Sequence, residues 1–124
     1  MQRKLFVKLG LAAALALAVQ GTALANGALA IDGNQGDQYG FSYNHPSMGA
    51  AEQRALGECG SGCNVVLRFS SGCAAYAADQ SRGSSIYGWY QANSGGSAQN
   101  GAMNECRSRG GRACQVRAWG CNSR

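Results

Sequence analysis

Apolar and polar residues alternate along several short stretches of this chain. Aromatic side chains occupy every second position of residues 39–43, and apolar ones do the same in residues 63–69. A period of two is typical of a strand that buries one face. In residues 63–69 this alternation predicts an inward face made of Cys63, Val65, Leu67 and Phe69, with Asn64, Val66 and Arg68 on the other side.

Two further stretches space their small and apolar residues as a helix does. One predicted helical face holds Ala51, Ala55, Leu56 and Cys59, and the other holds Ala98, Ala102, Met103 and Cys106. Ser47 is placed to cap the start of the first helix, and Gly60 to cap its end. The small residues predict that each helix lies close to a sheet.

The second half of the chain repeats the first at an offset of about 47 residues. Residues 28–32 align with residues 75–79, and residues 51–59 with residues 98–106. An offset of 48 aligns Tyr39-Gly40-Phe41 with Tyr87-Gly88-Trp89. Both halves present their elements in the same order, so the chain contains a duplicated strand-strand-helix-strand unit.

Each half is too short to build an ordinary core alone, so we expect the halves to fold together and to share one sheet. The predicted fold class is α+β, with six strands and two helices in one small disulfide-bonded domain. That domain spans residues 26–124 and divides into repeats at about 27–72 and 73–124.

The first 25 residues have the features of a signal peptide. Arg3, Lys4 and Lys8 precede an apolar run over residues 9–19. Ala23-Leu24-Ala25 and Ala28-Leu29-Ala30 both match the pattern before a cleavage site, and we expect cleavage after Ala25. A bilayer-spanning helix needs about 20 apolar residues, more than this run supplies. We therefore expect an exported protein without a stable membrane anchor, located in the periplasm or secreted.

Removal of this segment lowers the net charge. The whole chain carries +5, but eight basic residues, all arginine, and six acidic ones remain after residue 25. A nearly balanced charge gives little general attraction for nucleic acid, so no nucleic-acid partner is predicted. Five of the eight arginines lie in residues 107–124, where they form either a solvated surface or a contact for an anionic partner.

Six cysteines in an exported chain indicate disulfide bonds. Cys59 and Cys106 are equivalent positions at helix ends, and Cys63 and Cys114 are equivalent strand starts. The pairing that treats both halves alike is Cys59–Cys63, Cys106–Cys114 and Cys73–Cys121.

The order of these motifs resembles a known family. Residues 39–44, the helix ending at Cys59, residues 63–69, the strand that starts at Cys73 and the final Trp-Gly-Cys are similar to the exported bacterial family named domain of unknown function 4189. The resemblance covers about residues 28–121. It implies a small, secreted or periplasmic, disulfide-bonded domain, and it brings no agreed activity or catalytic residues.

Few residues suit catalysis. His45 is the only histidine, and its place beside Pro46 favours a turn. Glu58 and Glu105 precede the two helix cysteines at matching positions, and two carboxylates about 5–10 Å apart in one cleft would suit a glycosidase. Because so few residues suit catalysis, we expect no enzyme, no cofactor and no metal. The alternative is a small secreted hydrolase that acts on cell wall or glycan through these two carboxylates.

The second half carries candidate binding residues that the first half lacks. Trp119, Arg117 and Tyr90 belong to residue types enriched at binding hot spots, and the positions matching Trp119 and Tyr90 hold Arg68 and Ser42. Strand alternation predicts Arg117 and Trp119 on one exposed face. The predicted function is an exported, non-enzymatic interaction protein: a binder, inhibitor, immunity factor or effector with a protein or glycan partner.

Overall fold

The computed structural model describes residues 24–33 and 38–123, so the predicted signal peptide lies almost wholly outside the described residues. The first half contains β1 (Asn26–Ile31), β2 (Tyr39–His45), α2 (Met48–Cys59) and β3 (Asn64–Phe69). The second half contains β4 (Cys73–Asp79), β5 (Tyr87–Ala92), α3 (Gly95–Ser108) and β6 (Cys114–Cys121). The predicted α+β class and duplicated unit are confirmed.

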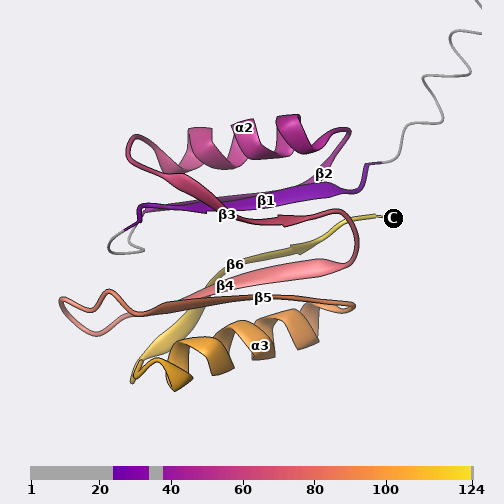
Figure 1. The fold of residues 1–124 in the computed structure, drawn as a ribbon. Coiled ribbons are helices and arrows are strands. Elements are labelled where there is room, and N and C mark those ends of the chain that lie inside the picture. The colour runs from indigo at the N-terminus through magenta and orange to yellow at the C-terminus, as the bar shows by residue number, and fades with distance from the viewer. Residues whose placement is uncertain (1–23, 34–37, 124) are drawn as a thin grey trace, which may run out of the picture.

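Each half forms its own antiparallel sheet of three strands. The orders are β2-β1-β3 and β5-β4-β6, so the first strand of each repeat lies in the centre of its sheet. The two sheets stack on each other, and α2 and α3 cover the outer faces (Figure 1). The molecule therefore has four layers, with a helix on the outside of each sheet.

The expectation that the halves share one sheet is wrong. The central strands β1 and β4 are buried along nearly their whole length, which requires cover on both faces. A helix covers one face of each sheet, and the opposite sheet covers the other. Leu29, Ile31 and Tyr76 lie at this inter-sheet core, with half-buried aromatic side chains around them. A single six-stranded sheet with both helices on one side would expose those aromatics to water.

The predicted strand alternation in residues 39–43 is correct. Tyr39 and Phe41 face the opposite sheet, whereas Gly40 and Ser42 face α2. Trp89, the counterpart of Phe41, is also half-buried between the sheets, where it stacks on Tyr87 at 5.6 Å between ring centroids.

Glycine lets each helix lie directly on its sheet. A Cβ on Gly40 would overlap the carbonyl of Ala55 in α2, and a Cβ on Gly88 would come within 2.7 Å of the Ala102 carbonyl oxygen in α3. Each helix places two alanines and one cysteine against the sheet; these residues are Ala51, Ala55 and Cys59 in α2, and Ala98, Ala102 and Cys106 in α3. The predicted helical faces are therefore the buried ones.

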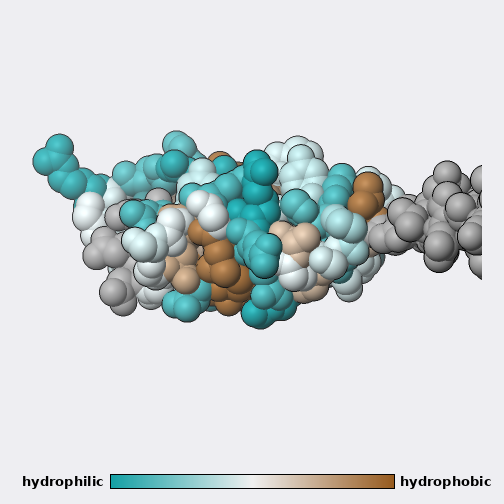
Figure 2. Space-filling model, turned by 90° about the horizontal axis from the view of Figure 1, so that it is seen from above, coloured by the Kyte–Doolittle hydropathy of each residue, from teal (hydrophilic) through white to brown (hydrophobic). Residues whose placement is uncertain are grey.

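Figure 2 views the molecule from the α2 side, where an apolar patch lies among hydrophilic side chains.

Both helices begin at a serine cap. Ser47 Oγ accepts a hydrogen bond from the Ala50 N–H at 3.1 Å, and Ser94 Oγ accepts one from the Ser97 N–H at 3.2 Å. Gly60 follows α2 with φ 100° and donates its N–H to the Leu56 carbonyl. The caps expected at Ser47 and Gly60 are therefore present.

A β-bulge in each third strand breaks the predicted alternation. Leu29 pairs with Leu67 but Ala30 pairs with Val65, so Val66 is an extra residue in β3. The prediction that Cys63, Val65, Leu67 and Phe69 share one face is therefore wrong. Cys63 and Val65 pack against the α2 core, whereas Leu67 faces the opposite sheet, because an extra residue reverses the side-chain order beyond it.

The structure contains three disulfides, and their pairing is the one that the repeat predicts. Cys59–Cys63 joins the end of α2 to the residue before β3, Cys106–Cys114 joins α3 to β6, and Cys73–Cys121 joins directly opposite residues of β4 and β6. The described cysteines include no free thiol. The second half therefore holds two complete disulfides within its own sheet and helix.

Candidate functional site

Two of the three predicted binding residues flank the outer helix of the second half. Tyr90 and Trp119 both pair with Ala75, one from each neighbouring strand, so all three side chains point toward α3. Ala75 is fully buried beneath the helix, while Tyr90 and Trp119 are 46% and 49% exposed. The two aromatic side chains therefore stand on opposite sides of α3.

Glycines of α3 make room for these two side chains. A Cβ on Gly101 would overlap the Tyr90 ring, and a Cβ on Gly95 would lie 2.5 Å from an atom of the Trp119 ring. Each ring thus packs one part of its surface on a glycine and leaves the rest in water. Half-exposed aromatic rings held in place by backbone contacts are suited to binding, because little side-chain freedom is lost on association.

Arg117 is not part of this surface, and the predicted common face of Arg117 and Trp119 is wrong. Tyr76 pairs with Ala118 and Ala77 pairs with Val116, so Arg117 is the extra residue of a β-bulge in β6. Beyond the bulge the alternation is reversed. Trp119 consequently lies on the α3 side, together with Val116.

The Arg117 side chain instead contacts both halves of the protein. Its guanidinium lies 5.7 Å from the centre of the Tyr39 ring and donates a hydrogen bond to the Gln80 side chain. The Tyr39 hydroxyl donates to the Arg117 carbonyl at 3.3 Å. These contacts connect β6 to β2 across the two sheets, so Arg117 has a structural role here.

A shallow groove of about 320 Å³ lies between Tyr90 and the exposed side of α3. We call it the Tyr90 groove, and it is lined by Tyr90, Ser97, Asn100, Gly101, Asn104 and Glu105. Except for the aromatic ring and the glycine, every lining side chain carries a hydroxyl, an amide or a carboxylate. Glu105 is the only charged lining residue, and its carboxylate lies 3.7 Å from the Arg109 guanidinium.

The first half has a counterpart of this groove, but three of its polar side chains are held by contacts within the protein. The depression beside β2 and α2 measures about 180 Å³ and is lined in part by Ser42, Arg54 and Glu58. Ser42 Oγ donates to the Ala51 carbonyl at 2.6 Å, and Arg54 pairs with Glu58 at 2.7 Å. These three residues correspond to Tyr90, Gly101 and Glu105 of the second half. Replacement of an arginine by a glycine thus accompanies the larger opening there.

The two glutamates of the hydrolase alternative do not share a cleft. Glu58 is on α2 and Glu105 is on α3, the two outer layers on opposite sides of the stacked sheets (Figure 1). They line separate depressions, and Glu58 also accepts a hydrogen bond from the Phe41 N–H at 3.2 Å. These two carboxylates therefore cannot act on one glycosidic bond from opposite sides.

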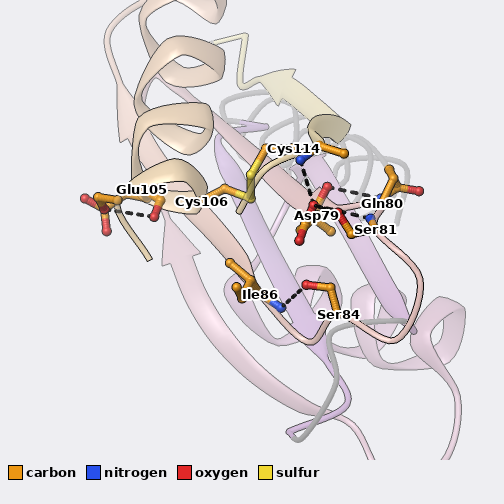
Figure 3. Close-up of a disulfide and its surroundings, with 11 residues drawn as sticks. Asp79, Gln80, Ser81, Ser84, Ile86, Glu105, Cys106 and Cys114 are labelled. Carbon is orange, nitrogen blue, oxygen red and sulfur yellow. Dashed lines mark hydrogen bonds between the residues drawn. A yellow bond between two sulfur atoms is a disulfide. The ribbon is translucent and has the colours of Figure 1, made fainter. Parts of the chain in front are cut away.

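Asp79 is the carboxylate whose pKa is most clearly perturbed in the described chain, and its contacts are structural. Hydrogen bonds from the Ser84 side chain, from the Ala113 N–H at 2.8 Å and from Ser81 lower the pKa of Asp79 to about 2. These donors belong to the β4–β5 connection and to the segment before Cys114 (Figure 3). Asp79 therefore ties two connections together beside the Cys106–Cys114 disulfide.

The described part of the chain shows no cluster of metal-ligating side chains. Its His, Cys, Asp and Glu side chains nowhere gather in a group of three or more that could hold a metal ion. His45 lines the first-half depression, and its carbonyl accepts a hydrogen bond from the Asn26 side chain. In residues 24–33 and 38–123, no helix is both long and apolar enough to span a bilayer.

Sequence reasoning selected Tyr90 as a binding residue and Glu105 as a candidate carboxylate, but it missed the other residues of the groove. Asn100, Gly101 and Asn104 had a visible signal, because they lie outside the buried face of the helix and differ from the aligned first-half residues Gln53, Arg54 and Gly57. These residues line a groove only because Tyr90 lies beside them, and only the strand register places Tyr90 there.

Comparison with known proteins gives a family and no function. A family model described as "Domain of unknown function (DUF4189)" matches residues 26–121, which is nearly the whole described domain. No curated protein and no solved structure matches the chain significantly.

Proposed function

The chain belongs to the DUF4189 domain family, and we propose that it is an exported, non-enzymatic interaction protein that binds its partner through the second half. The observation that carries this proposal is the pair Tyr90 and Trp119. Both are about half exposed, both pack on glycines of α3, and the equivalent first-half positions hold Ser42 and Arg68. A binder, an inhibitor, an immunity factor or an effector would use such a surface.

In the first half, the residues at the equivalent positions make only structural contacts to the helix. Arg68 pairs with Glu52 of α2 at 2.8 Å, and Ser42 bonds the α2 backbone. These polar contacts fasten the helix without exposing aromatic area. Exposed aromatic rings are costly in water unless something covers them, so two such rings flanking α3, where the first half has Ser42 and Arg68, support a specialised contact.

Two features support export. Three disulfides in so small a domain are typical of the periplasm and the extracellular space. In addition, β1 begins at Asn26, the first residue left by cleavage after Ala25, so this cleavage would remove nothing from the sheet.

Partner capture from periplasm and culture medium tests the proposal. The mature, oxidised protein should retain a partner, and Tyr90→Ala combined with Trp119→Ala should weaken this retention. Because both rings are half exposed, the free energy of unfolding should fall by only about 1–2 kcal/mol, as thermal unfolding would show.

Tyr43→Ala is the matched control, since Tyr43 is 45% exposed but lies in the first half. This variant should capture as the wild type does. Equal loss of capture in the control, or unchanged capture by the Tyr90 and Trp119 variant, would refute the second-half surface.

A further inference from the structure

We infer that the Tyr90 groove is a binding site for a neutral oligosaccharide. This inference rests on the proposed function, because it assigns a ligand class to part of the same surface. It starts from a difference between the repeats: the groove of the second half is larger than that of the first and has an aromatic wall in place of a serine.

The polar side chains of the Tyr90 groove are available for a ligand. No hydrogen bond joins the side-chain amide of Asn100 or Asn104 to another described residue, whereas Arg54 and Glu58 of the first half bind each other. The Glu105 side chain remains 45% exposed beside Arg109. Since Gly101 supplies no side chain at the arginine position, Glu105 has no partner within the groove itself.

These groups match the chemistry of a sugar. Neighbouring hydroxyls of a pyranose each donate and accept, and they need partners that do both or that complement one another. Two amides, a hydroxyl and a carboxylate offer this mixture along a single side of α3. The Tyr90 ring supplies an apolar surface for the C–H groups of a sugar ring, as expected of a small-molecule site with few placed polar groups.

The charge of the groove selects against anionic sugars. Glu105 is its only charged lining residue, and no arginine lines it. A uronic acid or a sulfated sugar would bring a second negative charge to this carboxylate, and the neighbouring Arg109 lies outside the groove and already pairs with Glu105. The groove therefore favours an uncharged glycan.

An NMR titration of the ¹⁵N-labelled, mature, oxidised protein tests the assignment. The probes are cellotetraose, the β-1,4-linked tetramer of N-acetylglucosamine, and tetragalacturonate as the anionic comparison. At least one neutral tetramer should shift the amide signals of residues 97–105 in a saturable manner, and tetragalacturonate should shift them less.

The first half supplies the variant that closes the groove. Tyr90→Ser combined with Gly101→Arg recreates the residues found at positions 42 and 54, an arrangement that the same fold already accommodates. This variant should bind the neutral sugar at least about fivefold more weakly. Tyr43→Ala alters an exposed ring in β2 of the first half, outside the Tyr90 groove, and should leave sugar binding unchanged.

Absence of shifts with both neutral tetramers would overturn the assignment. So would shifts confined to another part of the protein, or equal binding by the groove-closing variant. If Tyr90→Ala combined with Trp119→Ala abolishes partner capture while neither neutral sugar binds, the glycan assignment alone fails and the proposed function stands.

Discussion

Asn44 and Asn122 join the two halves of the protein end to end. The backbone N–H of Asn44, in β2, donates to Oδ1 of Asn122, just after β6, at 2.8 Å. Oδ1 of Asn44 accepts in return from the Ser123 N–H at 2.6 Å, and Nδ2 of Asn122 donates to the Phe69 carbonyl at 3.3 Å. Asn44 has φ 61°, a left-handed conformation that asparagine tolerates better than most residues.

Asn122→Ala should lower the free energy of unfolding by about 1–3 kcal/mol, because it leaves the Asn44 N–H and the Phe69 carbonyl without this partner. Chemical denaturation measures the loss. Ser123→Ala is the control, since Ser123 contributes its backbone N–H, and it should be close to neutral. Equal effects of the two substitutions would contradict a specific role for the Asn122 amide.

Glycines that face a sheet–helix contact and glycines that face water should respond in opposite directions to alanine. Gly40→Ala places a methyl group on the α2 backbone and should destabilise by at least about 2 kcal/mol. Gly57 lies in α2 itself, and a Cβ added there meets nothing within 4 Å apart from the helix's own backbone. Gly57→Ala should therefore raise the free energy of unfolding by about 0.5–1 kcal/mol. Thermal unfolding of the two variants decides, and a tolerated Gly40→Ala would contradict the close approach.

The three disulfides should differ in their contribution to stability. Cys73–Cys121 closes a loop with a sequence separation of 48, against 4 for Cys59–Cys63. In the chain-entropy account, its removal by paired alanine substitutions costs about 4 kcal/mol, against about 2 kcal/mol for the short bridge. Urea denaturation of both double variants gives the comparison, and a larger loss for the short bridge would contradict this account.

Acid should weaken the fold partly through Asp79. Its pKa is about 2 in the folded protein and near 3.8 when unperturbed, so the unfolded chain binds the proton more readily. The stability that Asp79 contributes is therefore fully present above about pH 4 and is lost as the pH falls toward 2. Asp79→Asn should lose less stability than the wild type over this interval. Parallel pH profiles of thermal unfolding would contradict the assignment.

Export should produce a mature protein that begins at Asn26. Cleavage after Ala25 leaves β1 intact, whereas cleavage after Ala30 would remove all but the last residue of the central strand of the first sheet. N-terminal sequencing of the protein from the periplasm or the medium distinguishes the two sites. A mature terminus at Ile31 would be incompatible with the sheet described here.

The sequence by itself determined the local elements and the equivalence of the two halves. The alternation in residues 39–43, the alanine spacing of both helices and the serine cap of α2 each arise from interactions within a few residues. The repeat then reduced six cysteines to one symmetric pairing, which the structure contains. Such inferences succeed because strand and helix periods are fixed by backbone geometry.

Only the tertiary structure decided how the two halves meet and which side chains share a surface. The repeat did not distinguish one six-stranded sheet from two stacked sheets, because that choice depends on covering both faces of β1 and β4. The bulges at Val66 and Arg117 were equally hidden, since an extra residue is defined only against the partner strand. That single residue moves Trp119 to the α3 side and separates it from Arg117. The composition of the candidate site thus depends on strand register, which long-range pairing sets and local sequence does not.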